Sequence, residues 1–416
     1  MSHTTAEMPS VRRGMVIVAL MVAGESVFLL PFVLARVFRP TFLDVFEITN
    51  LELGTAFSLY GIVAMAAYFA GGPLADRFSA RRLMAAALVA TGVPSIPVMN
   101  GLWAFWGLTS ILLFWAAMLR ATREWGGVAN QGRAYGLLDG GRGLLAAVIA
   151  SATVVVFAML LPSDASTATP DEIEAAFRAV IWVFTGFTLF VAFLVWVVVP
   201  DNAPTSDQGD RPKLSLKGLQ GAFKMPAVWL QAVIVVCAYV GYKATDDFSL
   251  LARDALGFDD VAASAIGTLS FWIRAVTAVA AGYLGDRIDS SRVIAWGFGI
   301  VIAGSALIAS GWLAPGVAWM LIATITATGV GIYALRGVYF ALLAEGAVPL
   351  AFTGSAIGVV SLVGFTPDVF MGPLMGVLLD NSPGVVGHQH VFAVVAAFGV
   401  IGLAATIAFR RVTQRA

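Results

Sequence analysis

The chain has 416 residues, 59% of them hydrophobic and 12% charged, and its mean hydropathy is +0.87. Soluble domains carry roughly a quarter charged residues, so this composition excludes a water-surrounded globule and predicts that lipid is the solvent for most of the chain. The net charge of zero argues against a nucleic-acid partner. The single cysteine, Cys237, cannot form a disulfide within the chain, and no Cys/His cluster has metal-ligand spacing, so neither a metal nor another cofactor is expected.

Apolar runs that approach the length of a membrane span, about 20 residues, predict an all-α membrane protein with twelve transmembrane helices. In the first half they are expected near residues 13–38, 53–74, 83–98, 102–118, 134–161 and 177–199. In the second half they are expected near residues 227–250, 261–284, 293–312, 317–343, 352–379 and 391–408.

The first apolar run follows Arg12 and Arg13, and a basic pair before an apolar run also begins signal peptides. The run continues to about residue 38, which is longer than a signal core, and carries Glu25 at its middle. We therefore expect it to be retained as the first span.

Residues 200–213 are rich in proline, small polar residues and charges, which is typical of a solvated linker. They predict three parts: an N-terminal six-helix bundle over residues 1–199, a cytoplasmic linker over 200–225, and a C-terminal six-helix bundle over 226–416. Lys and Arg in short loops favour the cytoplasm. Basic residues gather on the side of the membrane where the linker and both termini lie, so the linker and termini are expected in the cytoplasm. The chain itself is expected in the inner or plasma membrane.

A short motif closes the second apolar run and is repeated, more weakly, between the eighth and ninth. The first copy contains Gly72, Asp76, Arg77, Arg81 and Arg82, and the second contains Gly282, Asp286, Arg287 and Arg292. This pattern resembles the signature loop of the major facilitator superfamily of secondary transporters. The resemblance implies two six-helix bundles related by pseudo-two-fold symmetry.

The same resemblance implies a gate in these loops. Asp76 would meet the start of the eleventh span near residues 351–354, and Asp286 the start of the fifth span near residues 133–136. An alternative is a purely topogenic basic loop, which is equally open for Arg81, Arg82 and Arg292. The gating candidates are Gly72, Asp76, Arg77, Arg81, Arg120, Arg123, Asp286, Arg287 and Arg292.

Charged residues inside membrane spans usually face a cavity or a partner, and here they recur at helical spacing. The stripes are Tyr239, Tyr242, Lys243 and Asp246; Tyr135, Asp139 and Arg142; Ser270, Arg274 and Thr277; Tyr333 and Arg336; and Glu25 with Arg36. We interpret them as the lining of a polar central cavity with excess positive charge. The alternative for Asp139 and Arg142, one turn apart, is mutual neutralisation.

The expected substrate-binding residues are Arg36, Tyr239, Tyr242, Lys243, Arg274, Arg336 and Arg142. Arg274 has no acid one turn away, so its counter-ion would come from another helix or from the substrate; Arg336 also lacks one and could instead serve the gate. The segments around Arg36 and Lys243 are similar to those that carry the basic pair of the organophosphate antiporters in the superfamily, although Lys replaces Arg at the second position. Near Pro367, which predicts a kink, Asp368 is open to a hinge role or to substrate contact.

Candidates for proton coupling are Glu25, Asp139 and Asp246. Burial of Glu25 at mid-span would favour its protonated form; the alternative is a permanent ion pair with Lys243 or Arg142. His388 and His390 are expected in a loop on the outer face, where neither would act as a shuttle.

Taken together, these patterns predict a secondary transporter that moves a small organic anion (a carboxylate, phosphate ester or sulfonate) by alternating access, driven by a proton or solute gradient. The sequence has no Gly-x-x-x-x-Gly-Lys-Ser/Thr loop for a nucleotide and no nucleophile–base constellation typical of an enzyme. The alternatives are a proton-coupled exporter of hydrophobic or cationic compounds and a transporter-like sensor. Its partners would be the bilayer, the anion and protons, and it would act as a monomer.

Overall fold

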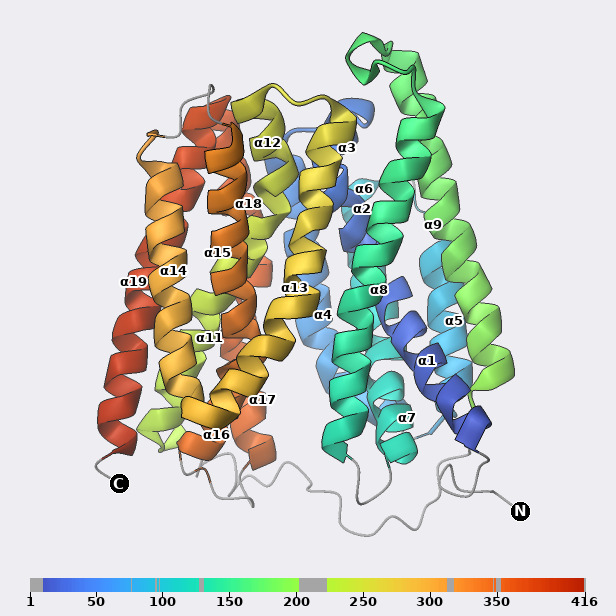
Figure 1. Cartoon of the computed structure of the whole chain (residues 1–416). Coiled ribbons are helices and arrows are strands. Elements are labelled where there is room, and N and C mark those ends of the chain that lie inside the picture. Colours follow the sequence, from blue (N-terminus) through green and yellow to red (C-terminus); the bar gives the residue numbers. More distant parts are fainter. Residues whose placement is uncertain are drawn as a thin grey trace. The chain divides into compact units, whose positions relative to one another are not determined.

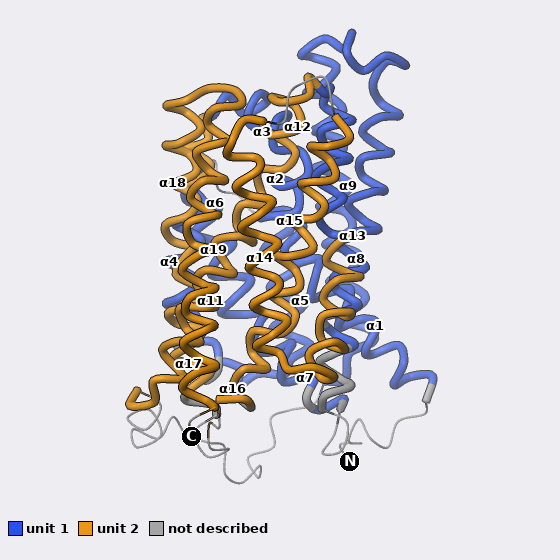
Figure 2. Tube along the Cα trace, turned by 60° about the vertical axis from the view of Figure 1, so that its left-hand side comes forward, with its two compact units in different colours: residues 1–48, 55–206, 258–271 blue, residues 49–54, 207–257, 272–416 orange. Residues whose placement is uncertain are grey.

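The computed structural model describes residues 10–75, 77–93, 96, 98–126, 131–201, 223–312, 318–346, 348 and 353–414. These residues form helices joined by short turns and contain no strand (Figure 1). The chain packs as two compact units (Figure 2): unit 1 comprises Met1–Ile48, Thr55–Ser206 and Phe258–Phe271, and unit 2 comprises Thr49–Gly54, Asp207–Gly257 and Trp272–Ala416.

In the described residues up to 201, the chain forms nine α-helices with three further π- or 3-10-helical segments among them. They are α1 (Ser10–Ser26), η2 (Leu29–Val33), α2 (Leu34–Val37), α3 (Arg39–Val45), α4 (Asn50–Ala75), α5 (Ala80–Gly92), α6 (Met99–Gly107), η3 (Leu108–Trp115), α7 (Ala116–Gly126), α8 (Gln131–Leu160), η4 (Ala165–Thr167) and α9 (Pro170–Val198). The start of α9 shows why a helix begins where it does. The side chain of Thr169 accepts from the amide of Glu172, whose own side chain caps Thr169 in return, and Pro170 has the first helical position.

The described residues from 223 onwards form nine α-helices and two short 3-10 turns. They are α11 (Pro226–Ala244), η5 (Thr245–Asp247), α12 (Phe248–Leu256), α13 (Asp260–Ile288), α14 (Ser290–Ala309), α15 (Ala318–Val338), η6 (Tyr339–Ala341), α16 (Leu342–Glu345), α17 (Thr353–Gly364), α18 (Pro367–Asn381) and α19 (Val385–Thr413). The break between α17 and α18 at Pro367 agrees with the expected kink.

Ten helices in the described residues are long and apolar enough to cross a membrane, and eleven if α1 and the segment Leu29–Val37 count as one bent span. The expected count of twelve is therefore not fully reproduced. The third expected span corresponds to α5, which has 13 residues and would be only about 20 Å long, against a hydrocarbon core of about 30 Å. Residues 94, 95 and 97, at the end of that expected span, lie outside the described residues.

Two other expected spans are interrupted in the structure. The first bends by 40° between α1 and the π-helical turn η2. Pro31 lies in that turn and has no N–H, so it cannot complete the hydrogen-bond ladder of a straight helix. The seventh expected span breaks after Ala244, where η5 separates α11 from α12.

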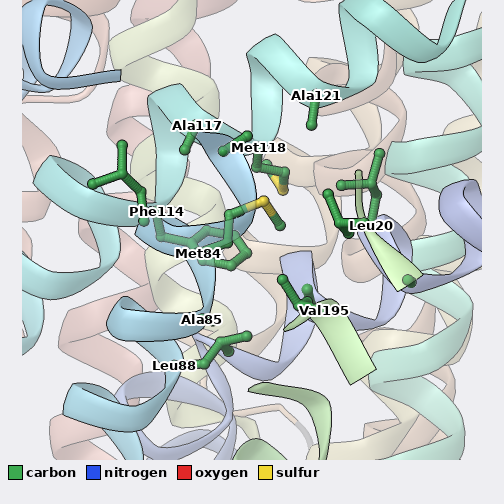
Figure 3. Close-up of a cluster of buried hydrophobic side chains, with 14 of the residues drawn as sticks. Leu20, Met84, Ala85, Leu88, Phe114, Ala117, Met118, Ala121 and Val195 are labelled. Atoms are coloured by element: carbon green, nitrogen blue, oxygen red, sulfur yellow. The ribbon is translucent and has the colours of Figure 1, made fainter. Parts of the chain in front are cut away.

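A cluster of buried apolar side chains joins α1, α5, α7 and α9 in unit 1 (Figure 3). Leu20, Met84, Leu88, Met118 and Val195 belong to it and are fully buried. In a bilayer the lipid is as apolar as these side chains, so close packing rather than removal from water stabilises the contact.

Glycines allow some helices of unit 2 to approach closely. A Cβ built on Gly331 in α15 would lie 2.9 Å from the carbonyl oxygen of Gly297 in α14. A larger residue at Gly331 would therefore separate the two backbones.

Candidate functional site

Unit 2 holds a buried lysine between two carboxylates. Lys243 is in the last turn of α11, with Nζ 3.4 Å from an oxygen of Asp246 in η5 and 3.6 Å from Oδ1 of Asp368 in α18. Burying a lone charge costs several kcal/mol on most scales, so these two carboxylates are what allow Lys243 to be 4% exposed.

Asp368 is the residue that sequence reasoning left out of the expected site. It follows Pro367 in the first turn of α18, where the helix dipole favours a negative charge, and its two oxygens accept from the Tyr239 hydroxyl at 3.0 and 3.2 Å. The available signal was an acid directly after a proline inside an apolar run. Local spacing does not show which helix such an acid faces.

Arg336 in α15 lies against the tyrosines of α11. Its guanidinium carbon is 3.7 Å from the ring centroid of Tyr242 and 5.4 Å from that of Tyr239, a cation–π arrangement. Its Nη1 is buried and has no hydrogen-bond partner among the described residues, and the same is true of the hydroxyl of Tyr333. The Tyr333 ring lies 6.3 Å from that of Tyr242.

The structure thus brings together five residues expected from the sequence, Tyr239, Tyr242, Lys243, Asp246 and Arg336, and adds Asp368. Tyr239, Tyr242 and Lys243 share α11 as their spacing predicted, whereas Asp246 lies beyond its end in η5. With both carboxylates ionised, the two cations are balanced by two anions, so this cluster does not have the excess positive charge that was expected.

Unit 1 contains a second buried charge pair. Arg142 in α8 lies with Nε 3.5 Å from Oε2 of Glu25 in α1 and donates to the carbonyl of Gly24 at 3.0 Å. Its guanidinium also lies 5.5 Å from the ring of Phe28 and 5.4 Å from that of Trp115. Of the alternatives for Glu25, the structure shows the ion pair with Arg142; the side chain of Asp139 lies outside the described part of α8.

The two remaining expected cations are placed differently. Arg36 is buried in α2, with its guanidinium 5.4 Å from the ring of Phe271, a residue of the same unit. Arg274 is half-buried on α13, four residues from Ser270 and three from Thr277. It has an interaction partner within the chain, and a role for Arg274 in anion binding stays a prediction.

The gating candidates of unit 1 mostly contact their own neighbourhood. Arg81 and Arg82 lie 2.6 and 3.1 Å from Oδ2 of Asp201, beyond the end of α9. Arg120 donates to the carbonyl of Ala75 and lies 3.3 Å from Glu124. Gly72 lies in α4 and Arg77 is exposed after it, whereas Asp76, the side chain of Arg123 and residues 351 and 352 lie outside the described residues.

In unit 2 the repeated motif is exposed. Asp286 is exposed in the last turn of α13, Arg287 donates to the hydroxyl of Tyr283 at 2.5 Å, and Arg292 pairs with Asp289 at 3.1 Å. The side chains of residues 133–136, which Asp286 was expected to meet, lie outside the described residues. Gating by either loop stays a prediction.

Asp201, which lies outside the spans and pairs with Arg81 and Arg82, has a shifted pKa. The Ser79 hydroxyl first, and then Arg82 and Arg81, stabilise its ionised form and lower the pKa of Asp201 below its usual value. Ser79 also caps α5 by accepting from the amide of Arg82 at 3.4 Å. Asp201 therefore connects the end of α9 with the start of α5.

His388 is not in a loop as expected. It lies in the first turn of α19, fully buried, with Nδ1 2.6 Å from Asp247 and Nε2 3.1 Å from Asp254. The expectation was wrong because Gly387, His388 and Gln389 lower the local hydropathy, although α19 begins before them at Val385. His390 is exposed on the same helix.

Comparison with known proteins identifies the family. The model of the Major Facilitator Superfamily matches residues 15–251, more than half of the chain. The inner membrane protein YqcE of Escherichia coli (strain K12) is 24% identical over 384 residues, which cover 88% of this chain and 87% of the relative. The probable nitrate/nitrite transporter NarK2 of Mycobacterium tuberculosis (strain H37Rv) is 28% identical over 327 residues, covering 74% of this chain and 75% of that protein.

Solved structures of transporters have the same fold. A bacterial homologue of the human lysosomal transporter Spinster matches with a TM-score of 0.73 at 15% identity, over 98% of this chain and 99% of that one. The nucleoside transporter NupG matches with a TM-score of 0.67 at 15% identity, over 96% and 99% of the two chains. The chain therefore belongs to the Major Facilitator Superfamily and is a multi-pass membrane transporter with its all-helical fold.

Proposed function

We propose that this transporter carries a small organic anion of the carboxylate, phosphate ester or sulfonate type by alternating access, energised by a proton or solute gradient. We also propose that it acts as a monomer made of two six-helix bundles with both termini in the cytoplasm. The relatives YqcE and YihN are named as inner membrane proteins of Escherichia coli, which supports the inner membrane as its location.

The proposal of an anionic substrate rests on the environment of the Arg336 guanidinium. The guanidinium is always charged, it stacks on Tyr242, and its buried Nη1 has no hydrogen-bond partner in the described part of the chain. An unused N–H on a buried cation costs free energy unless a ligand accepts from it. A carboxylate, phosphate or sulfonate oxygen would form the strongest hydrogen bond with this N–H, because hydrogen bonds between charged groups are stronger than those between neutral groups.

The neighbouring hydroxyl of Tyr333, also without a partner among the described residues, offers a second donor. Lys243 offers a third only when a carboxylate leaves it. Asp368 is the carboxylate that can leave most easily, since its side chain is 24% exposed whereas that of Asp246 is 5% exposed. An incoming anion would replace Asp368 at Lys243, and protonation of Asp368 would favour that exchange, which links the anion to a proton.

The name of NarK2 supports an anionic cargo, since nitrate and nitrite are anions. The other names do not point to one class of solute, so the geometry of Arg336 carries the proposal.

Thermal unfolding of the purified protein with matched solutes tests the proposal. Glucuronate, glycerol 3-phosphate and ethanesulfonate should be compared with glucose, glycerol and ethanol. We expect at least one anion, and none of the neutral solutes, to raise the Tm of the wild type. Arg336→Gln should lose this shift, because glutamine keeps polar N–H groups but removes the charge.

The matched control is Arg178→Gln, which removes an exposed cation paired with Glu174 and should keep the anion-induced shift. A shift that persists in Arg336→Gln would contradict the assignment of the site.

A second candidate function is proton-coupled export of hydrophobic or cationic compounds. The observation that favours it is the aromatic surface beside Asp368, where the rings of Tyr239 and Phe365 lie 5.1 Å apart. This function predicts stabilisation by hydrophobic cations that is retained in Arg336→Gln and lost in Asp368→Asn.

A further inference from the structure

A buried histidine between two carboxylates lies in unit 2, at the start of α19. Nδ1 of His388 is 2.6 Å from Oδ2 of Asp247, and Nε2 is 3.1 Å from Oδ2 of Asp254. The side chains of His388 and Asp247 are fully buried, whereas that of Asp254 is 24% exposed. The three groups come from three elements, η5, α12 and α19.

The two hydrogen bonds fix the number of protons in this triad. An ionised carboxylate only accepts, and a neutral imidazole has one N–H and one lone pair. Both contacts can be hydrogen bonds only if both ring nitrogens carry protons, or if one nitrogen and one carboxyl do. In either case the triad holds one proton more than a neutral ring between two carboxylates.

We propose that Asp247, His388 and Asp254 form a proton-binding site of the transporter, in which the extra proton holds α12 against α19. The ring is an imidazolium when the site is loaded. On unloading, one N–H bond breaks and the proton passes to water, so a nitrogen lone pair then faces a carboxylate. Asp254 is the partner that gives way, because water can solvate its carboxylate and cannot reach Asp247.

The charged groups around His388 leave these two carboxylates as its partners. On α12, Arg253 accompanies Asp254, with Nε 3.7 Å from Oδ1. Among the helices packed against α19, α11 carries Lys243, which pairs with Asp246 and Asp368. On α14, Arg292 pairs with Asp289 in the turn before the helix. At the end of α18, Asp380 accepts from the amides of Asn50 and Leu51.

A metal ion does not fit the triad. Its carboxylates face opposite nitrogens of one ring, so one ion cannot contact all three groups. No group of three potential ligands suited to a metal occurs in the described residues.

The triad is connected to the Lys243 cluster through the short helical turn η5. Asp246 and Asp247 are neighbours in η5, and Asp246 lies 3.4 Å from Lys243. The second oxygen of Asp247, Oδ1, is buried with no hydrogen-bond partner in the described part of the chain, so the ring supplies its principal restraint. A change at His388 would therefore shift the carboxylate that neutralises Lys243. The proposal goes beyond the anion and does not depend on which solute is carried.

Nitrogen-15 NMR of histidine-labelled, full-length protein in detergent tests proton binding directly, with the His388 signal identified by its loss in His388→Gln. We expect two protonated ring nitrogens at about pH 7.5, because the two facing carboxylates favour the charged ring, and one at about pH 10. In Asp254→Asn the side-chain amide can donate a hydrogen bond to an unprotonated Nε2, so the ring needs no second proton. This variant should therefore have one protonated ring nitrogen at both pH values.

Hydrogen–deuterium exchange of the α12 amides separates a proton-binding site from a fixed structural contact. After correction for the intrinsic rate, exchange in the wild type should rise by about tenfold or more between the two pH values, as for local opening. Asp254→Asn should abolish this dependence, and His390→Gln, which changes an exposed histidine of the same helix, should behave as the wild type.

A His388 ring with a single proton at pH 7.5, or two protons throughout the range, would overturn the proposal. So would α12 exchange that does not change when the ring loses its proton. Because Asp254→Asn keeps the shape of a partly exposed side chain, the exchange test remains decisive if His388→Gln fails to fold.

Discussion

Glu25 and Arg142 show how individual residues allow charge to persist in a membrane helix. Their charged atoms lie 3.5 Å apart, and Arg142 also uses the carbonyl of Gly24 and the rings of Phe28 and Trp115. Removing one partner of a buried pair leaves the other uncompensated, which typically costs about 3–5 kcal/mol. Arg142 therefore keeps the carbonyl of Gly24 and the two rings as neighbours when Glu25 is neutralised.

The two single substitutions should therefore be unequal. We expect Arg142→Ala to lower the free energy of unfolding by about 3 kcal/mol or more and Glu25→Gln to lower it less, since glutamine is neutral and leaves Arg142 bound to Gly24. Urea-dependent unfolding of the detergent-solubilised protein measures both changes. Equal losses in the two single variants would contradict the predicted asymmetry. A double variant no more stable than the sum of the single losses predicts would show that the two residues are not coupled.

Residue spacing allowed part of this site to be predicted. Tyr239, Tyr242 and Lys243 share one face of α11 because positions three and four apart are neighbours on a helix. The sequence left Asp368 open to a hinge role or to substrate contact and placed His388 in a loop for a physical reason: their partners lie on other helices, and one sequence contains no direct signal for such a contact. The balance of charge around Lys243 likewise depends on Asp368 and was not visible along the chain.

At the scale of elements, the packing of α1 depends on a small residue beside its charge. A Cβ on Gly24 would lie 2.8 Å from Sδ of Met118 and 2.9 Å from Cδ of Arg142, whereas a Cβ on Gly14 in the same helix would meet nothing within 4 Å. These two positions form a matched pair for testing helix contact against helix propensity.

We expect Gly24→Ala to destabilise the protein by about 1–3 kcal/mol, as overpacking does. Gly14→Ala should instead leave the free energy of unfolding unchanged or raise it by up to about 1 kcal/mol, because alanine has the higher helix propensity. Thermal unfolding of both variants measures the difference. A stabilising effect of Gly24→Ala would contradict the close approach of α1 to α7 and α8.

The contact between α5 and α9 depends on pH through Asp201. Because the pKa of Asp201 is lower in the folded protein, its contribution is fully present above its ordinary value of about 4 and is lost as the pH falls through the lowered value. The contribution should stay below about 1 kcal/mol, since this ion pair is partly solvated.

Asp201→Asn should therefore lower the Tm slightly at neutral pH, and its difference from the wild type should shrink as the pH falls below about 4. High salt should reduce the difference as well. A difference that grows on acidification would reverse the assigned sign.

Element boundaries were predictable where hydropathy decides and not where local geometry does. Apolar runs located the long helices, but the 40° bend near Pro31 and the turn after Ala244 interrupt segments that hydropathy alone indicates as single spans. Hydropathy measures only the preference of a segment for lipid. The bend depends on the missing N–H of Pro31, and the turn after Ala244 depends on polar side chains that need partners.

At the scale of the whole molecule, the motif around Gly72 and Arg77 and its repeat near Asp286 correctly indicated the superfamily, which the match over residues 15–251 shows. These loops identify the fold, whereas the groups suited to bind a solute lie within the helices. We therefore propose that Arg336, Tyr333, Lys243 and Asp368 determine which substrate is carried.

Uptake into proteoliposomes tests that assignment most directly. Wild type, Arg336→Gln and Arg178→Gln should be reconstituted at equal density and given the radiolabelled anion that raises the Tm, with its neutral counterpart as control. We predict that the wild type and Arg178→Gln accumulate the anion and not the neutral solute, and that Arg336→Gln loses about tenfold or more of this uptake, as expected when a charged hydrogen bond worth about 1.5–3 kcal/mol is removed. Undiminished anion uptake by Arg336→Gln would contradict the central claim.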